Sequence, residues 1–242
     1  MSEALALDVG EAPDALHTLT IAFDRRRLVG DQIYEALKAS IVSLRLPPGA
    51  SISENRICSQ IGVSRTPVRT AIIRLVEDGL IEVFPQKGSF VAPIKLSTVR
   101  NNHFIRKAIE IAVLRRASPA WTRKVAARSR QILARQSAAL AEEDIDRFYE
   151  LDEAFHRAFC TAAALDGVWC TIQIAKARVD RVHRLAAAQG RLPHVIAEHG
   201  DILDALDAGD AARAVERLDY HLERAPAIME TLIGAYEKYF VD

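Results

Sequence analysis

The stretch that decides the fold of the first half of the chain is SISENRICSQIGVSRTPVRTAIIRLVEDGLIEVFPQKGSFV, residues 51–91. Ser53 can cap a short helix that runs to Ile61, because its side-chain oxygen can accept a hydrogen bond from a free amide of the first turn. Gly62 fits the left-handed residue that ends such a helix. The spacing therefore predicts two helices joined by a tight turn, with the second starting at Ser64.

The second of these helices is predicted to have a buried face and a polar start. The Ser64 hydroxyl can cap it, and Pro67 is tolerated in the first turn because the amides there have no intrahelical partner. Apolar residues at helical spacing form the predicted buried face, which consists of Val68, Ile72, Leu75 and Val76. Residues 80–84 and 89–91 then predict two short strands around the turn Pro85-Gln86-Lys87-Gly88.

The residues before this stretch add one more helix. Ile33, Leu37 and Ile41 recur every four positions, which predicts a helix over residues 28–44 that ends before Pro47-Pro48-Gly49. The order helix, helix, turn, helix, hairpin is that of a winged helix-turn-helix. We expect this domain to occupy residues 25–93.

Formal charge is distributed unevenly, although the net charge is zero. Residues 1–24 hold five acids and no Lys or Arg, residues 25–95 hold 11 basic and 6 acidic residues, and residues 96–242 hold 21 of each. The excess of five positive charges in the middle segment fits a nucleic-acid partner, but such an excess is also common on solvated surfaces. Residues 1–24 predict an acidic, mobile tail.

The rest of the chain predicts a soluble, mainly α-helical protein. Residues 97–240 form Ala-, Leu- and Arg-rich stretches, broken near residues 118, 143, 166, 190 and 209, which predicts a bundle of about six antiparallel helices.

Neither a membrane-spanning apolar run nor a signal peptide is evident, so we expect a cytoplasmic protein without a membrane partner. The three cysteines lack a CxxC pair and are predicted to be small buried hydrophobic residues.

Polar residues stand where a helix-turn-helix reads DNA. The first two turns of the second helix enter the major groove in such folds, and here they hold Arg65, Thr66 and Arg69. Arginine is suited to a bidentate contact with guanine. On spacing alone, two arginines four residues apart are better explained as a solvated helix face, but the surrounding order of elements reverses that preference in favour of DNA reading.

Several short motifs occur along residues 28–92, namely Leu46-Pro-Pro-Gly-Ala, Ser53-Glu54, Gly62-Val-Ser-Arg-Thr-Pro-Val-Arg69, Arg74-Leu75 and Asp78-Gly79-Leu80-Ile81. Together they resemble the GntR family of repressors. The resemblance implies a homodimer on near-palindromic, double-stranded operator DNA. It also implies DNA contacts from Ser64, Arg65, Thr66 and Arg69, from the wing tip Lys87-Gly88, and from Asn55 or Arg56.

The helical half contains a candidate metal site. Asp152 and His156 lie four residues apart and therefore share one face of a predicted helix. His199 and His221 occur within apolar helical patterns further along. A carboxylate with imidazoles is a common ligand set for a divalent transition ion. Each histidine could instead be a core residue satisfied by one hydrogen bond, and Asp152 could pair with an arginine.

Three motifs stand out in residues 97–225: Asp152-x-x-x-His156, Glu198-His199 before Ile-Leu-x-Ala-Leu-x-x-Gly-Asp, and His221-Leu222. Together they resemble the FCD ligand-binding domain that follows GntR-type winged helices in the FadR-like branch of the family. It implies a divalent metal bound by Asp152, His156, His199 and His221, with zinc favoured over nickel or manganese. It further implies a small carboxylic-acid effector near the metal, which Arg106 of an Arg106-x-x-x-Glu110 pair could contact. An ordinary ion pair between Arg106 and Glu110 within one helix explains this spacing equally well.

These features predict a DNA-binding transcriptional repressor, not an enzyme, that a small carboxylate releases from its operator. The alternative is a metal-dependent hydrolase with an accessory DNA-binding domain, in which the same ligands would activate water. The chain has no HExxH, Gly-x-Ser-x-Gly or phosphate-cradling glycine loop, and a hydrolase would leave the winged helix unexplained. A constitutive DNA binder would need neither metal ligands nor a ligand cavity.

Overall fold

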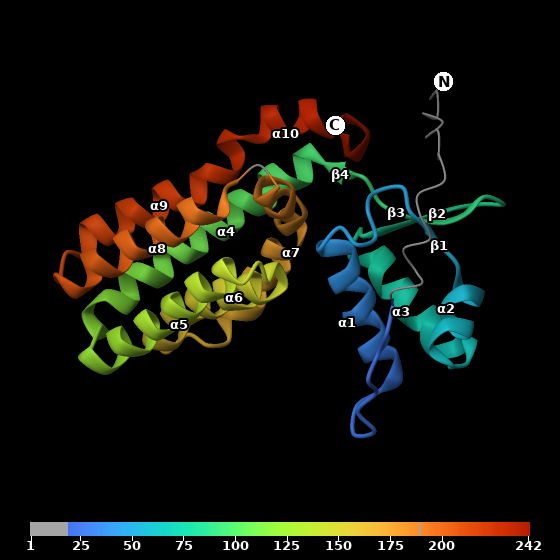
Figure 1. Ribbon diagram of the computed structural model, residues 1–242, viewed down its shortest axis with the longest axis horizontal. Coiled ribbons are helices and arrows are strands. Elements are labelled where there is room, and N and C mark those ends of the chain that lie inside the picture. Colours follow the sequence, from blue (N-terminus) through green and yellow to red (C-terminus); the bar gives the residue numbers. More distant parts are fainter. Residues whose placement is uncertain (1–18, 189) are drawn as a thin grey trace. The chain divides into compact units, whose positions relative to one another are not determined.

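The computed structural model describes residues 19–188 and 190–242 and divides the chain into two compact units (Figure 1). The first unit comprises residues 19–96 with 236–242, and the second comprises residues 97–235. Residues 1–18, most of the predicted mobile tail, lie outside the described residues. The predicted fold class, mainly α with a small β-hairpin wing, is confirmed.

The first unit is a three-helix domain with a small sheet. Its helices and the strands of that sheet are α1 (Val29–Val42), β1 (Ser51–Ile52), α2 (Glu54–Ile61), α3 (Arg65–Glu77), β2 (Ile81–Phe84) and β3 (Gly88–Val91). The side chain of Ser53 accepts from the Arg56 amide, and Gly62 has a φ of 69°, so both predicted ends of α2 are confirmed.

The wing is an antiparallel sheet in the order β1-β3-β2. The predicted hairpin is confirmed, with Ile81 opposite Val91 and Phe84 opposite Gly88. The pairing of β1 with β3 was not predicted, because a two-residue strand is too short to show an alternating pattern. Gly88, with a φ of 108°, supplies a backbone conformation at the hairpin turn that side-chain-bearing residues rarely adopt.

Three details of this unit differ from the predictions. Ser64 precedes α3 but its side chain makes no capping hydrogen bond. Val76 is 37% exposed, and Ala71 occupies the buried face in its place, because the face follows the true helical rotation of 100° per residue. Leu19 is only 5% exposed and belongs to the core of this unit, so the packed chain begins within the predicted tail.

The second unit is a helical bundle. Its α-helices are α4 (Leu96–Ala117, whose first residue belongs to the first unit), α5 (Arg123–Ala141), α6 (Ile145–Ala162), α7 (Val168–Ala187), α8 (Leu192–Asp207), α9 (Ala211–Ala227) and α10 (Met229–Ala235). The helix ends fall at the breaks that the sequence predicted, and α10 is a short addition. Helix α5 packs against α6 and α8, and α8 packs along α9 (Figure 1).

Residues 236–240, expected in the helical domain, belong to the first unit instead. Strand β5 (Phe240–Val241) pairs in parallel with β4 (Ile94–Lys95). This pairing uses main-chain hydrogen bonds, which leave no signature in the side-chain pattern.

The bundle core surrounds α6. Phe155 and Phe159 of α6 are buried with Trp169 of α7 and Leu218 of α9. Of the three cysteines, Cys160 is buried as expected, whereas Cys58 is half-buried and Cys170 is exposed. Among the described residues, no helix combines the length and the hydropathy needed to cross a membrane.

Candidate metal centre and nucleic-acid interface

Three histidines from three different helices meet in the core of the bundle. His156 lies on α6, His199 on α8 and His221 on α9, and all three are buried. One ring nitrogen from each lies within 4.8 Å of the other two. Ligand atoms about 2.1 Å from a common metal are at most about 4.2 Å apart, so the cluster is close to a ligating geometry.

A polar side chain lies next to the Nδ1 atom of each histidine. Nδ1 of His221 lies 2.8 Å from Oε2 of Glu198. Nδ1 of His156 lies 2.6 Å from Oε2 of Glu110, an ion-pair contact whose alignment is not that of a hydrogen bond. Nδ1 of His199 lies 3.0 Å from Oε1 of Gln136. Since all three partners are acceptors, they favour a proton on Nδ1, as in metal sites with an outer shell. This leaves the Nε2 lone pair of His199 without a partner, whereas Nε2 of His156 faces the Arg106 guanidinium.

The Nε2 atoms of two histidines face Asp152. Its Oδ1 atom lies 3.7 Å from Nε2 of His199 and 4.0 Å from Nε2 of His156. Nε2 of His199 is buried and has no hydrogen-bond partner among the described residues. A buried polar atom without a partner is costly, and a bound cation would satisfy it. The structure thus brings the three predicted histidine ligands together and places Asp152 within 4.0 Å of two of them.

The protonation states also suit a cation site. Burial, followed by the charge of His221, holds the pKa of His199 well below its ordinary value. Burial lowers the pKa of His221 as well, although the bond to Glu198 offsets part of this effect. Burial alone would raise the pKa of Asp152, but the basic side chains around it, among them His156 and Lys176, lower it. The lowered pKa values of His199, His221 and Asp152 favour neutral imidazoles and an ionised carboxylate, which are the forms that bind metals.

Arg106 lies at the edge of this cluster. It is 4% exposed, and its Nε atom donates to Oε1 of Glu110 at 2.5 Å. Its Nη2 atom lies 3.3 Å from Nε2 of His156, the nitrogen that a metal would use. The Arg106–Glu110 ion pair expected from the sequence is therefore present, and it also contacts the histidine cluster directly.

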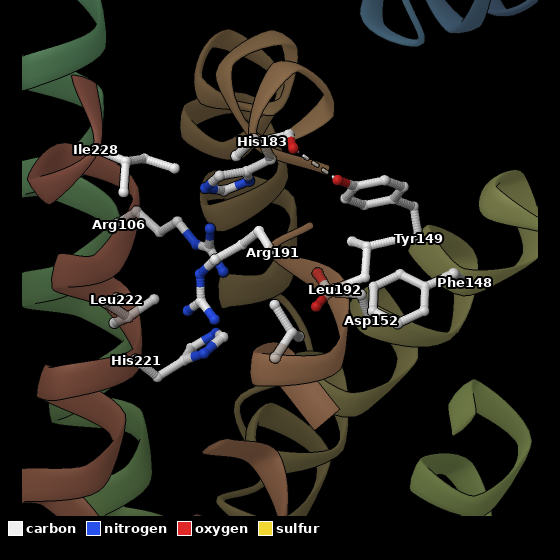
Figure 2. A pocket seen from close by; sticks show the side chains of 12 residues that line it. Arg106, Phe148, Tyr149, Asp152, His183, Arg191, Leu192, His221, Leu222 and Ile228 are labelled. Carbon is white, nitrogen blue, oxygen red and sulfur yellow. Dashed lines mark hydrogen bonds between the residues drawn. The ribbon is translucent and has the colours of Figure 1, made fainter. Parts of the chain in front are cut away.

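A small pocket opens beside the cluster, with a volume of about 50 Å³. Asp152 and His221 line it, and so do Arg106, Arg191 and His183 (Figure 2). Apolar side chains, including those of Phe148, Leu192 and Leu222, complete the wall. This lining combines positive charge with apolar surface, which suits a small organic anion.

Sequence reasoning missed two buried polar residues around the centre. Gln136 is on the buried face of α5, and Lys176 of α7 has its Nζ atom 2.8 Å from Asp180 and 3.7 Å from Asp152. Both interrupt apolar helical faces, because Gln136 lies one helical turn after Ile132 and Lys176 lies one turn after Ile172. A polar residue at such a position was the signal that could have identified them.

The predicted DNA-contacting residues are all exposed on the first unit. They are Asn55, Arg56, Ser64, Arg65, Thr66, Arg69, Lys87 and Gly88. The first two lie on α2, Ser64 to Arg69 lie at the start of α3, and the last two lie at the hairpin turn. On α3 the buried residues Val68 and Ala71 face the core, so the polar start of the helix remains available to a partner.

Comparisons with known proteins cover both units. Residues 29–91 match the bacterial regulatory proteins of the gntR family, and residues 103–224 match the FCD domain. The chain is 38% identical over 196 residues to the HTH-type transcriptional repressor RspR of Escherichia coli strain K12, covering 81% of this chain and 86% of the relative.

Solved structures agree in fold. E. coli McbR/YncC aligns with a TM-score of 0.72 at 23% identity, over 87% of this chain and 99% of that one. The crystal structure of a GntR regulator from Rhodococcus sp. RHA1 aligns with a TM-score of 0.70 at 26% identity, over 86% of this chain and 98% of that one.

Proposed function

The chain belongs to the GntR family of bacterial transcription regulators with an FCD domain, and from this premise we propose that it is a repressor controlled by a metal-assisted carboxylate effector. It is a regulator and not an enzyme, so the hydrolase alternative is not favoured. The name of its relative RspR includes the word repressor, which supports this direction of regulation.

DNA binding is assigned to the first unit. Arg65 and Arg69 are exposed at the start of α3 and can reach base edges and phosphates in the major groove. Lys87 and Gly88 at the wing tip would contact the backbone or minor groove, and Asn55 or Arg56 would add a contact from α2. One such helix covers a short half-site. We therefore expect a homodimer on a near-palindrome whose half-site centres are about 34 Å apart.

Asp152, His156, His199 and His221 would hold the divalent ion, with zinc favoured by the nitrogen-rich ligand set over nickel or manganese. The bound ion would supply positive charge and an open coordination position for a carboxylate oxygen. Arg106 lines the adjoining pocket and would contact the same acid. The small volume of the pocket favours a small acid.

The switch follows from the position of the ligands. They come from α6, α8 and α9, so an effector that contacts them can favour one packing of the bundle over another. Only such differential binding can shift the equilibrium of the dimer between DNA-binding and released forms. We expect release of the operator when the effector binds.

The observation that carries this proposal is the buried Nε2 atom of His199, which faces Asp152 without a hydrogen-bond partner among the described residues. The test is His156→Ala, with His194→Ala, an exposed histidine of α8, as the matched control. His156→Ala should lose the metal by mass spectrometry and lose operator release by titrated carboxylic acids, while still binding the operator. A metal-free His156→Ala protein that keeps its full response would refute the mechanism.

A further inference from the structure

A second concave site lies between α5 and α6, outside the metal centre. The groove has a volume of about 410 Å³. That volume falls within the range of about 300–1,000 Å³ that is usual for small-molecule pockets. Its walls are largely apolar and small, with Val125 and Ile132 from α5 facing Ala154 and Ala158 from α6.

An unsatisfied hydroxyl group lies in the lining of this groove. Ser129 of α5 is only 1% exposed, and its Oγ atom has no hydrogen-bond partner among residues 19–188 and 190–242. A helical serine can usually satisfy its hydroxyl on the carbonyl four residues earlier. Leaving a buried hydroxyl unpaired costs free energy, which a bound polar group would recover.

Two arginines border the same groove, one from each helix. Arg128 and Arg157 are exposed, and neither makes a hydrogen bond or an ion pair with any residue in the described part of the chain. Arg130, two residues along α5, shows the contrast, because it pairs with Asp204 and Asp207. The groove therefore carries two positive charges that the bundle itself leaves uncompensated.

We propose that this groove is a second ligand site, which takes an organic acid with an apolar body. The apolar body would lie on the alanine, valine and isoleucine walls. Its carboxylate would pair with Arg128 and Arg157, and the Ser129 hydroxyl would donate to it. A free phosphate fits less well, because it would leave the apolar walls exposed to water. The site shares no residue with the pocket at the metal centre.

The test uses 4-phenylbutyrate as the probe and its amide, 4-phenylbutyramide, as an uncharged control of the same shape. Binding of each compound to the full chain is measured by calorimetry. The protein is first treated with a chelator, so that a carboxylate bound to a metal cannot contribute to the signal. We expect the acid to bind at least tenfold more tightly than the amide. Arg128→Gln and Arg157→Gln should each lower the affinity for the acid about five- to tenfold. Arg123 is an exposed arginine at the start of α5, and Arg123→Gln should leave this affinity unchanged.

A blocking variant provides an independent readout. Ala158→Leu places a larger side chain in the groove and should abolish binding of the probe. If Ala158→Leu fails to fold, the two exposed arginine variants decide the question, since neither arginine makes a hydrogen bond or an ion pair in the described part of the chain. Parental affinity in both arginine variants, or no binding of the acid at millimolar concentration, would overturn the proposal. If Ala158→Leu changes the dimerisation seen by sedimentation and the parent protein does not bind the probe, the groove is an interface between copies of the chain. That outcome would also overturn the proposal.

Discussion

The substitution Gln136→Ala tests whether the side chains behind the histidines control metal binding. Gln136 is completely buried on α5, and its Oε1 atom lies 3.0 Å from Nδ1 of His199. It does not face the predicted metal position, so its effect must pass through the imidazole. Removing the amide takes away the acceptor that favours a proton on Nδ1 and a free lone pair on Nε2.

The size of the effect follows from the burial of this pair. With Gln136 gone, Nδ1 of His199 loses its partner in a fully buried position, which costs about 1–3 kcal/mol for an unsatisfied donor. The ring can avoid this cost by moving the proton to Nε2, but that tautomer has no lone pair on the nitrogen that faces Asp152 and cannot bind a metal there. Outer-shell substitutions typically weaken metal affinity about 10–100-fold, which corresponds to about 1.4–2.8 kcal/mol. The two ranges agree.

Zinc affinity would be measured by competition with a chelating indicator, in parallel with thermal unfolding of metal-free and zinc-loaded protein. We expect Gln136→Ala to lower zinc affinity at least tenfold and to reduce the stabilisation by zinc accordingly. Gln131→Ala, at an exposed position of the same helix, should keep the parental affinity. Gln136→Glu retains an acceptor for His199 and should preserve zinc binding better than alanine does.

Parental zinc affinity in a folded Gln136→Ala protein would contradict this reasoning. It would mean that the orientation and the tautomer of His199 are set by other contacts. One such contact is Phe155, whose ring stacks on His199 at a centroid distance of 3.8 Å.

Four further predictions concern DNA binding, the core, the metal and pH. Arg65→Ala should cost about 1–3 kcal/mol of operator affinity in a gel shift, and Lys87→Ala should weaken binding with less dependence on the DNA sequence. If a folded Arg65→Ala protein kept the parental affinity, α3 would not be the helix that reads the DNA. Phe155→Ala should lower the free energy of unfolding by about 3–5 kcal/mol in denaturant titrations, because the ring is fully buried; a loss below about 1 kcal/mol would argue against the described packing. Chelation should lower the Tm, and zinc should restore it; an unchanged Tm would count against a bound metal. Partial burial would raise the pKa of Asp207, but hydrogen bonds from Trp121 and Arg130, together with the charge of Arg130, outweigh it and lower the pKa, so the carboxylate stabilises the fold at neutral pH. That contribution should disappear as the pH falls below about 4, and Asp207→Asn should flatten this part of the stability profile.

The sequence by itself was sufficient to predict the winged helix and the positions at which the helices of the bundle end. Both depend on local physics: apolar residues at helical spacing define a buried face, and Ser53 and Gly62 end α2 through contacts within a few residues. Local patterns were not sufficient to identify the four candidate metal ligands. Their spacing allowed each histidine to be an ordinary core residue, and only the family resemblance connected His156 with His199 and His221, which lie far apart in the chain.

Tertiary structure alone decided which side chains stand behind those ligands. Gln136 and Glu110 meet the histidines across helices, and a contact between distant segments has no periodic signature. The same holds for the pairing of β4 with β5, and for Ser129, whose hydroxyl lies unpaired in a groove that exists only when α5 and α6 are packed together. Local patterns specify which face of an element is buried, but the partner that covers it depends on the assembled core.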